Sequence, residues 1–156
     1  MKCKTAADAP YRLYILMRTD LPSMPPGRAM AQAAHAANQF IHEYGNRSAV
    51  KGWQKDANGF GTTICLAATK SIIEDVVERA CNIGHEAGLV YDPTYKFDVP
   101  SELAPLILVN ALTAPTITKD DGSCIMFRNE LTCGYLFISK DSPDREILIG
   151  SLALHP

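Results

Sequence analysis

The chain has 156 residues, of which 47% are hydrophobic and 21% charged, and this composition is typical of a globular domain that can bury its own core. Its formal net charge is −2, so the chain as a whole is not a general binder of polyanions, and nucleic acid would have to bind at a local basic patch. The five cysteines are scattered and contain no Cys-x-x-Cys pair. This pattern argues against a disulfide framework and favours the reducing cytoplasm.

The sequence gives no sign of targeting to a membrane. No apolar run approaches the roughly 18–20 residues that cross a bilayer. No apolar segment follows the N-terminal Met-Lys-Cys-Lys, as a signal peptide would require. We therefore expect a cytoplasmic protein with no membrane partner.

The first half of the chain predicts alternating strands and helices after a loose leader of about ten residues. Residues 47–61 are polar and contain three glycines, and we expect them to form a loop. Ser71-x-x-Glu74 is a capping-box pattern, which predicts that a helix begins beside it. The predicted elements are a strand at 11–18, a helix at about 27–44, a strand at 62–68 and a helix at about 72–87.

In the second half, Asp120-Asp121-Gly122-Ser123 is a turn signal between two apolar runs, and it predicts a β-hairpin. The order of strands and helices predicts an α/β fold, a three-layer sandwich in which helices flank a small mixed β-sheet. The predicted elements here are a strand at 88–91 that resumes at 95–99, hairpin strands at 116–118 and 124–127, a strand at 133–138 and a short helix at 143–150.

The helix predicted at 27–44 carries two contrasting faces. One is a line of hydrogen-bonding groups that starts with a cation: Arg28, Gln32, His35, Gln39 and His42. The other lies roughly 160–200° away and is expected to pack on the sheet: Met30, Ala34, Ala37 and Ile41. The polar face begins where a strand ends, which makes it a candidate site on a rigid element.

The motifs of several common sites are absent. The chain has no Gly-x-Gly-x-x-Gly, no Gly-x-x-x-x-Gly-Lys-Ser/Thr and no Gly-x-Ser-x-Gly, so the usual dinucleotide, nucleotide and serine-hydrolase sites are not expected. His35 and His42 are seven residues apart, too far for the compact i, i+4 chelate of a zinc helix. We therefore expect neither a metal nor a cofactor.

Two residues of the polar face are candidates for chemistry. Arg28 stands in the first helical turn, where unpaired backbone N–H groups already favour an anion. Its guanidinium could clamp a phosphate or stabilise an oxyanion, or it could pair with a neighbouring carboxylate such as Asp20. His35 is either a base or substrate contact or a structural histidine.

Two residues outside this helix have alternative interpretations. Asp92 ends a predicted strand, a position from which carboxylates line the ligand crevice of α/β sheets; alternatively, it accepts hydrogen bonds from the following N–H groups in a turn. Trp53 lies between Lys51 and Lys55 and could stack on a nucleic-acid strand. A loop anchored by one indole is the simpler interpretation.

A family resemblance follows from the region after the first strand. Arg18-Thr19-Asp20-Leu21, then a methionine, a glycine, a basic residue and Gln32-x-x-His35-Ala36, resembles the archaeal/eukaryotic-type (class 2) peptidyl-tRNA hydrolases. The resemblance covers most of 11–99 and 133–155. It implies one domain over 1–156, in which residues 100–132, with the predicted hairpin, form an insertion.

This family hydrolyses the ester that joins a peptide to the terminal ribose of tRNA. By the resemblance, Arg28 binds a phosphate or the oxyanion, Asp92 activates or orients water, and His35 positions the reacting groups. The resemblance implies peptidyl-tRNA as the substrate, a homodimer and no cofactor. The residues that would contact the substrate are Asp20, Gln32, Thr94 and Lys96.

The chain departs from the family's pattern at three places. Arg28 replaces a lysine, and the loop at 22–24 is one residue longer. The family's Asp-Ala-Gly-x-Thr segment is Asp92-Pro93-Thr94-Tyr95-Lys96 here, so Lys96 holds the threonine's position and Thr94 substitutes for it only after a local shift. These departures support a second hypothesis, a re-purposed, non-catalytic member of the fold that binds a protein or a small anionic ligand.

Overall fold

The computed structural model describes residues 10–106 and 116–156, so the expected leader lies almost entirely outside the described residues, as does part of the expected insertion. The chain divides into two compact units. The first contains the chain up to Val90 and from Thr132 onward, and the second is Tyr91–Leu131. The elements are β1 (Tyr11–Arg18), α1 (Pro26–Tyr44), α2 (Ser48–Lys55), the 3-10 turn η2 (Ala57–Gly59), β2 (Thr63–Ala68), α3 (Lys70–Asn82), β3 (Glu86–Val99), β4 (Thr116–Thr118), β5 (Cys124–Ser139) and α5 (Pro143–Ile149).

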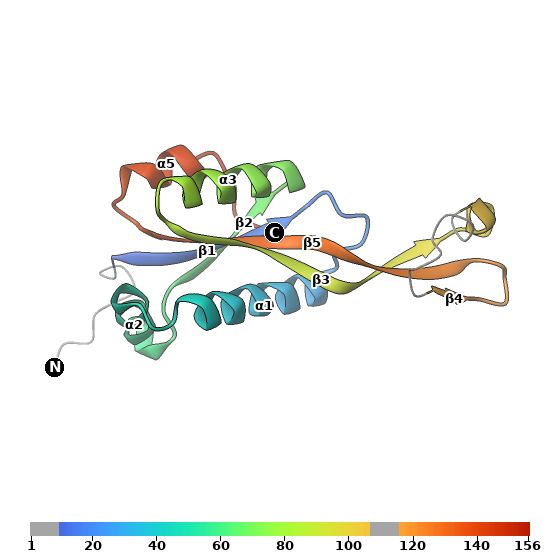
Figure 1. Ribbon diagram of the computed structural model, residues 1–156, viewed down its shortest axis with the longest axis horizontal. Coiled ribbons are helices and arrows are strands. Elements are labelled where there is room, and N and C mark those ends of the chain that lie inside the picture. The colour runs from blue at the N-terminus through green and yellow to red at the C-terminus, as the bar shows by residue number, and fades with distance from the viewer. Residues whose placement is uncertain (1–9, 107–115) are drawn as a thin grey trace. The chain divides into compact units, whose positions relative to one another are not determined.

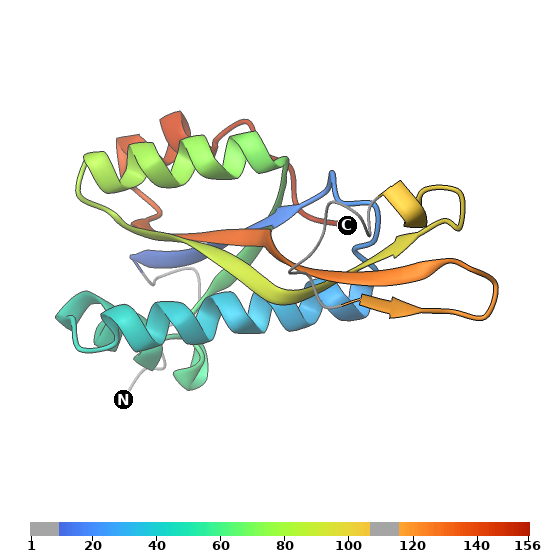
Figure 2. The same cartoon turned by 45° about the vertical axis from the view of Figure 1, so that its right-hand side comes forward.

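The strands form one mixed sheet with the order β2-β1-β5-β3, and β4 pairs with β5. β1 runs parallel to β2 and antiparallel to β5. In the first unit, α1 and α2 cover one face of the sheet and α3 and α5 cover the other (Figure 1 and Figure 2). The predicted three-layer α/β sandwich is therefore confirmed.

An aromatic cluster fills the core between α1, α2 and the sheet. The ring of Phe40 contacts the rings of Tyr44, Trp53, Tyr135 and Phe137. Each aromatic pair contributes about 0.5–1.5 kcal/mol beyond the burial of its surface. Packing at this end of α1 thus holds two helices and β5 together.

The loop predicted at 47–61 is wrong in part, because α2 occupies Ser48–Lys55. Trp53 is buried, and its indole N–H donates to the carbonyl of Thr62 at 3.0 Å. The indole anchors this segment and is not presented for stacking on nucleic acid. A helix this short has little stability of its own, so burial of its one apolar face decides its formation.

The helix predicted to end near residue 87 ends at Asn82. Gly84 has φ +89°, and the N–H of His85 bonds to the carbonyl of Ala80 at 2.9 Å, as in a Schellman motif. The helix begins at Lys70, one residue before Ser71, so the predicted capping box does not cap it. Instead, the side chain of Asp20 accepts from the backbone N–H of Lys70 at 3.3 Å. The cap comes from a residue fifty positions away, which local sequence patterns do not reveal.

The second unit contains the predicted hairpin, which is confirmed. Ile117 of β4 lies opposite Ile125 of β5. The turn closes where the N–H of Lys119 donates to the carbonyl of Ser123 at 2.8 Å, and Gly122 takes φ +80°. The two strand segments predicted at 88–91 and 95–99 form one continuous strand, β3.

Substitution of Gly61 by Ala should destabilise the protein more than the same substitution at Gly59. Both glycines have positive φ, +68° and +98°, so both substitutions incur about 1–2 kcal/mol of backbone strain. A Cβ at Gly61 would also overlap the indole of Trp53, whereas nothing lies within 4 Å of one at Gly59. We expect Gly61→Ala to cost a further 1–3 kcal/mol or so, measured by urea denaturation. Equal losses in the two variants would contradict this packing.

Candidate functional site

The N-terminus of α1 carries Arg28 in its first turn. Pro25 is the extended N-cap residue and Pro26 begins the helix, which has no side-chain cap and no acidic residue in its first turn. Nη1 of Arg28 donates to the carbonyl of Ser23 at 2.9 Å. A guanidinium at the positive end of a helix is unfavourable for the helix itself, and the two positive groups together attract an anion.

Asp20 links the end of β1 to the start of α3. One of its oxygens accepts from Nε of Arg18 at 2.7 Å, and the other accepts from the N–H of Lys70. Burial raises the pKa of Asp20, but the hydrogen bonds from Arg18 and Lys70 and the charge of Arg18 outweigh it, so the pKa lies below the ordinary value. The guanidinium of Arg18 is thereby held inside the first unit, where the residue is only 6% exposed.

Gln32 faces the sheet, which corrects the expected faces of α1. The buried residues of the helix are Ala29, Gln32, Ala36 and Phe40. Met30, expected in the core, is 68% exposed. The helix is turned because its smallest residues allow it to approach the sheet closely and because Gln32 finds a partner there.

That partner is Thr132 on β5. Its hydroxyl donates to Oε1 of Gln32 at 2.7 Å and lies 3.3 Å from the carbonyl of Val90. The adjacent thiol of Cys133 contacts the carbonyl of Gln32 at 3.5 Å, and burial raises the pKa of this thiol to about 12. Gln32 therefore forms a buried hydrogen bond that joins α1 to the sheet, and the expected polar face of the helix is interrupted at this residue.

His35 is exposed on α1. Farther along the helix, Gln39 donates to the carbonyl of Leu89 at 3.3 Å and to Glu43 at 2.9 Å. Arg28, His35 and Gln39 thus lie on one side of the helix, in agreement with the predicted spacing.

Asp92, Thr94 and Lys96 belong to the second unit. Oδ1 of Asp92 accepts from the N–H of Thr94 at 2.9 Å and from its hydroxyl at 3.0 Å. Asp92 was predicted to end a strand, but it lies within β3. Its contact with the N–H of Thr94 agrees with the alternative interpretation, in which the carboxylate accepts from a following backbone N–H. Lys96 approaches Asp98, which also pairs with Lys119 at 3.1 Å.

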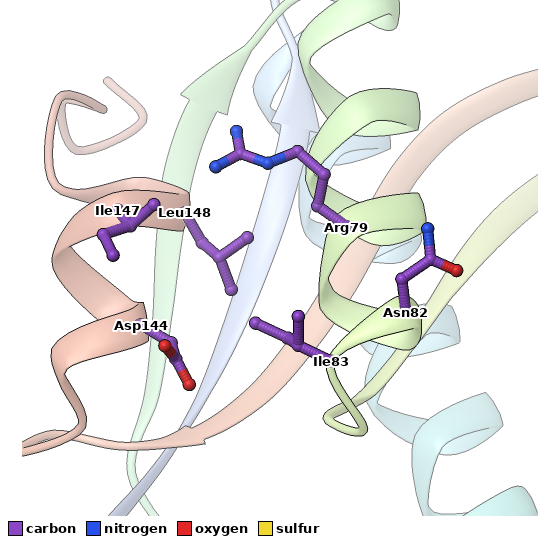
Figure 3. A pocket seen from close by; sticks show the side chains of 6 residues that line it. All are labelled: Arg79, Asn82, Ile83, Asp144, Ile147 and Leu148. Carbon is purple, nitrogen blue, oxygen red and sulfur yellow. The ribbon is translucent and has the colours of Figure 1, made fainter.

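Two pockets of the first unit were not anticipated from the sequence. One, of about 540 Å³, is lined by residues of β1, the loop after it, α1, β2 and the C-terminal tail: Met17, Met24, Pro26, Ala29, Met30, Ala33, Cys65, His155 and Pro156. The other, of about 270 Å³, lies between α3 and α5, where Ile83 and Leu148 face each other across it, and it is also lined by Arg79, Asn82, Asp144 and Ile147 (Figure 3). Their lining residues are distant in sequence, so no local motif marks them.

Within the described ranges, no three His, Cys, Asp or Glu side chains are grouped so that they could hold a metal ion. No helix of the described residues is long and apolar enough to cross a membrane.

A family model, peptidyl-tRNA hydrolase PTH2, matches residues 11–108. The chain belongs to this family. The match covers more than half of the chain and includes every residue that the sequence placed at the site, and it confirms the resemblance seen in the sequence. No curated protein shows a significant match to this PTH2 member. Among solved structures, a protein of unknown function from Agrobacterium tumefaciens C58 is similar over 94% of this chain and 98% of its own, with 10% identity and a TM-score of 0.47.

The pairing of Arg18 with Asp20 predicts a pH-dependent contribution to stability. A carboxyl whose folded pKa is lowered stabilises the fold above its unfolded pKa of about 3.9 and loses this effect as the pH falls through the folded pKa. We expect Asp20→Asn to cost about 1–2 kcal/mol at pH 7, because Asp20 is partly exposed. The difference should stay constant from pH 5 to 8 and shrink below pH 4 in chemical denaturation.

Asp75→Asn is the matched control, because Asp75 pairs with Arg79 on the exposed face of α3. Its effect should stay within about 0.5 kcal/mol. Equal effects of the two substitutions at pH 7 would refute a special role for Asp20.

Thr132→Val tests the buried hydrogen bond between Thr132 and Gln32. Valine preserves the shape of threonine but leaves Oε1 of Gln32 without the hydroxyl donor, which costs about 1–3 kcal/mol. Thr63→Val, at an exposed threonine of β2, controls for strand propensity and should be nearly neutral. Thermal unfolding of both variants measures the difference, and a neutral Thr132→Val would show that this hydrogen bond does not hold α1.

Proposed function

We propose that this PTH2 member hydrolyses the ester bond of peptidyl-tRNA, or of a related N-blocked aminoacyl ester, and releases free tRNA. The family match over residues 11–108 carries the proposal. The position of Arg28 at the first turn of α1 supports it, because an ester hydrolase needs a positive group where negative charge develops on the carbonyl oxygen.

In this proposal Arg28 is a catalytic residue that binds the oxyanion or the adjacent phosphate. The guanidinium is held by the carbonyl of Ser23 and lies at the positive end of the α1 dipole. Arginine differs from the family's lysine, since it offers several donors in a fixed plane in place of one compact ammonium. Arginine therefore binds two oxygens of one phosphate or carboxyl group better than it binds a single oxygen atom.

Asp92 is proposed to orient or deprotonate the attacking water, and His35 to position the reacting groups. The Thr94 hydroxyl and N–H both donate to one oxygen of Asp92, which fixes the carboxylate and supports a role for Thr94 at the substrate. We assign Lys96 to substrate phosphate. Asp20 and Gln32 are bonded within the first unit, so we propose that they act on the substrate by positioning the helix and the loop before it.

The segment that forms α1 and α2 carries an excess of positive charge, which supports a tRNA partner. Residues 26–55 contain four basic residues and one acidic residue, for a net charge of +3, although the whole chain is negative. Arg47 of this segment pairs with Glu86, and the positive charge that remains, at Arg28, Lys51 and Lys55, attracts a phosphate backbone. We also propose a cytoplasmic location, since the described cysteines are free thiols. From the family resemblance we further propose that the protein is a homodimer.

Hydrolysis of an N-acetylated aminoacyl-tRNA tests the proposal directly. We expect Arg28→Ala to lower kcat/KM by about 10²–10³-fold and Asp92→Asn by about 10²–10⁴-fold. Arg28→Ala should leave the free energy of unfolding within about 0.5 kcal/mol of its value, because the lost bond to Ser23 is offset by removal of a cation from the helix N-terminus. Arg79→Ala, at an exposed arginine of α3, controls for lost charge. Activity that survives both Arg28→Ala and Asp92→Asn would mean that the site is elsewhere.

A re-purposed, non-catalytic member that binds a protein or a small anionic ligand is the second candidate. It is favoured by the altered segment Asp92-Pro93-Thr94-Tyr95-Lys96 and by the charge of residues 91–131, which contain six acidic and three basic residues. The salt dependence of binding separates the two, because tRNA binding weakens steeply with salt and apolar protein contacts do not. A folded protein that neither cleaves the substrate nor binds tRNA would favour this candidate.

A further inference from the structure

The larger pocket of the first unit lies against the first two turns of α1. Ala29, Met30 and Ala33 form its helical wall, and Met17 at the end of β1 contributes from the sheet. The C-terminal tail forms another wall, where Leu154 pairs with Leu66 of β2. Its volume of about 540 Å³ falls within the roughly 300–1,000 Å³ of small-molecule sites.

The lining of this pocket is mainly apolar and rich in sulfur. Three of the chain's five methionines line it, Met17, Met24 and Met30. Cys65 and His155 are neighbours across the strand edge, because the N–H of His155 donates to the carbonyl of Cys65 at 3.0 Å. Burial raises the pKa of the Cys65 thiol, which keeps it neutral at pH 7. Flexible thioethers adapt to apolar groups of varied shape.

The pocket and Arg28 lie on opposite flanks of α1. Met30 is two positions after Arg28, which corresponds to about 160° around the helix. The pocket and the Arg28 guanidinium contact the same loop. Arg28 donates to the carbonyl of Ser23, and the next residue, Met24, lines the pocket. A substrate whose charged end meets the N-terminus of α1 thus has an apolar pocket within reach of that same loop.

We propose that this pocket binds the apolar side chain of the amino acid esterified to tRNA. The inference rests on the proposed function and deepens it, because it names the substrates that are preferred. A methionine-lined pocket accepts leucine, methionine or phenylalanine side chains and disfavours carboxylates, which would lose most of their hydration among its apolar side chains. The enzyme should therefore prefer esters of apolar amino acids to those of acidic ones by about tenfold to a hundredfold in kcat/KM.

Methionine methyl NMR tests the pocket without relying on activity. In protein labelled with ¹³C at the methionine methyl groups, N-acetyl-leucinamide should shift the signals of Met17, Met24 and Met30. The signal of Met126, in the second unit, is the internal control and should not move. N-acetyl-aspartamide (free β-carboxylate) should shift none of them. Unmoved signals, or equal shifts at Met126, would overturn the proposal.

A matched pair of substitutions tests the link to catalysis. Ala33→Leu fills the pocket from its helical wall, whereas Ala34→Leu adds the same side chain at an exposed position that does not line it. Ala33→Leu should abolish both the methyl shifts and the preference for N-acetyl-leucyl-tRNA over N-acetyl-aspartyl-tRNA, and Ala34→Leu should keep both. Met30→Asp, at an exposed residue of the mouth, provides a second variant if Ala33→Leu does not fold, and should reduce the preference at least tenfold.

The failures of the two proposals are distinguishable. Methyl shifts without hydrolysis of either substrate would remove the proposed function and retain an apolar ligand pocket. Hydrolysis of both substrates at equal rates without methyl shifts would retain the function and overturn the pocket.

Discussion

The hydrogen bond from Thr132 to Gln32 fixes how α1 lies on the sheet, and the candidate site depends on that placement. A polar pair this deep is stable only because both groups are satisfied, since each unpaired member would cost about 1–3 kcal/mol. Ala29 and Ala36, on the same face, let the helix approach closely enough for the 2.7 Å contact. The bond sets the rotation of α1 about its own axis. That rotation places Arg28 and His35 on one flank and the methionine pocket on the other.

Around this helix the first unit separates its charges. The α1–α2 layer is basic, whereas α3 and α5 have a slight acidic excess. The cation most deeply buried in β1, Arg18, is neutralised by Asp20, which also caps α3. Exposed cations remain on both sides of the sheet, but Lys70 and Arg79 of α3 pair with Glu74 and Asp75, so the excess of positive charge belongs to α1 and α2. The second unit contributes a net negative charge.

Much of the fold followed from hydrophobic patterning. The continuous apolar run at β1, the hairpin turn at Asp121 and Gly122, and the alternation of strands with helices each depend on neighbours in sequence. The errors share one physical cause. α2 forms because Trp53 packs on Phe40 and Phe137, α3 begins at a cap supplied from Asp20, and α1 turns Gln32 inward to meet β5. In each case a partner many residues away outweighed the local preference.

The sequence by itself determined the family, the mixed α/β architecture and the position of Arg28 at the start of a helix behind a proline turn. These depend on local residue types and spacing, which survive in any arrangement of the chain. Only the tertiary structure decided which face of α1 is buried, that Asp20 serves Arg18 and α3, and that three methionines line one pocket with Cys65 and the C-terminal tail. The reason is physical: the close packing of side chains and the pairing of buried polar groups depend on which elements meet, and that is settled only when the sheet and its helices come together.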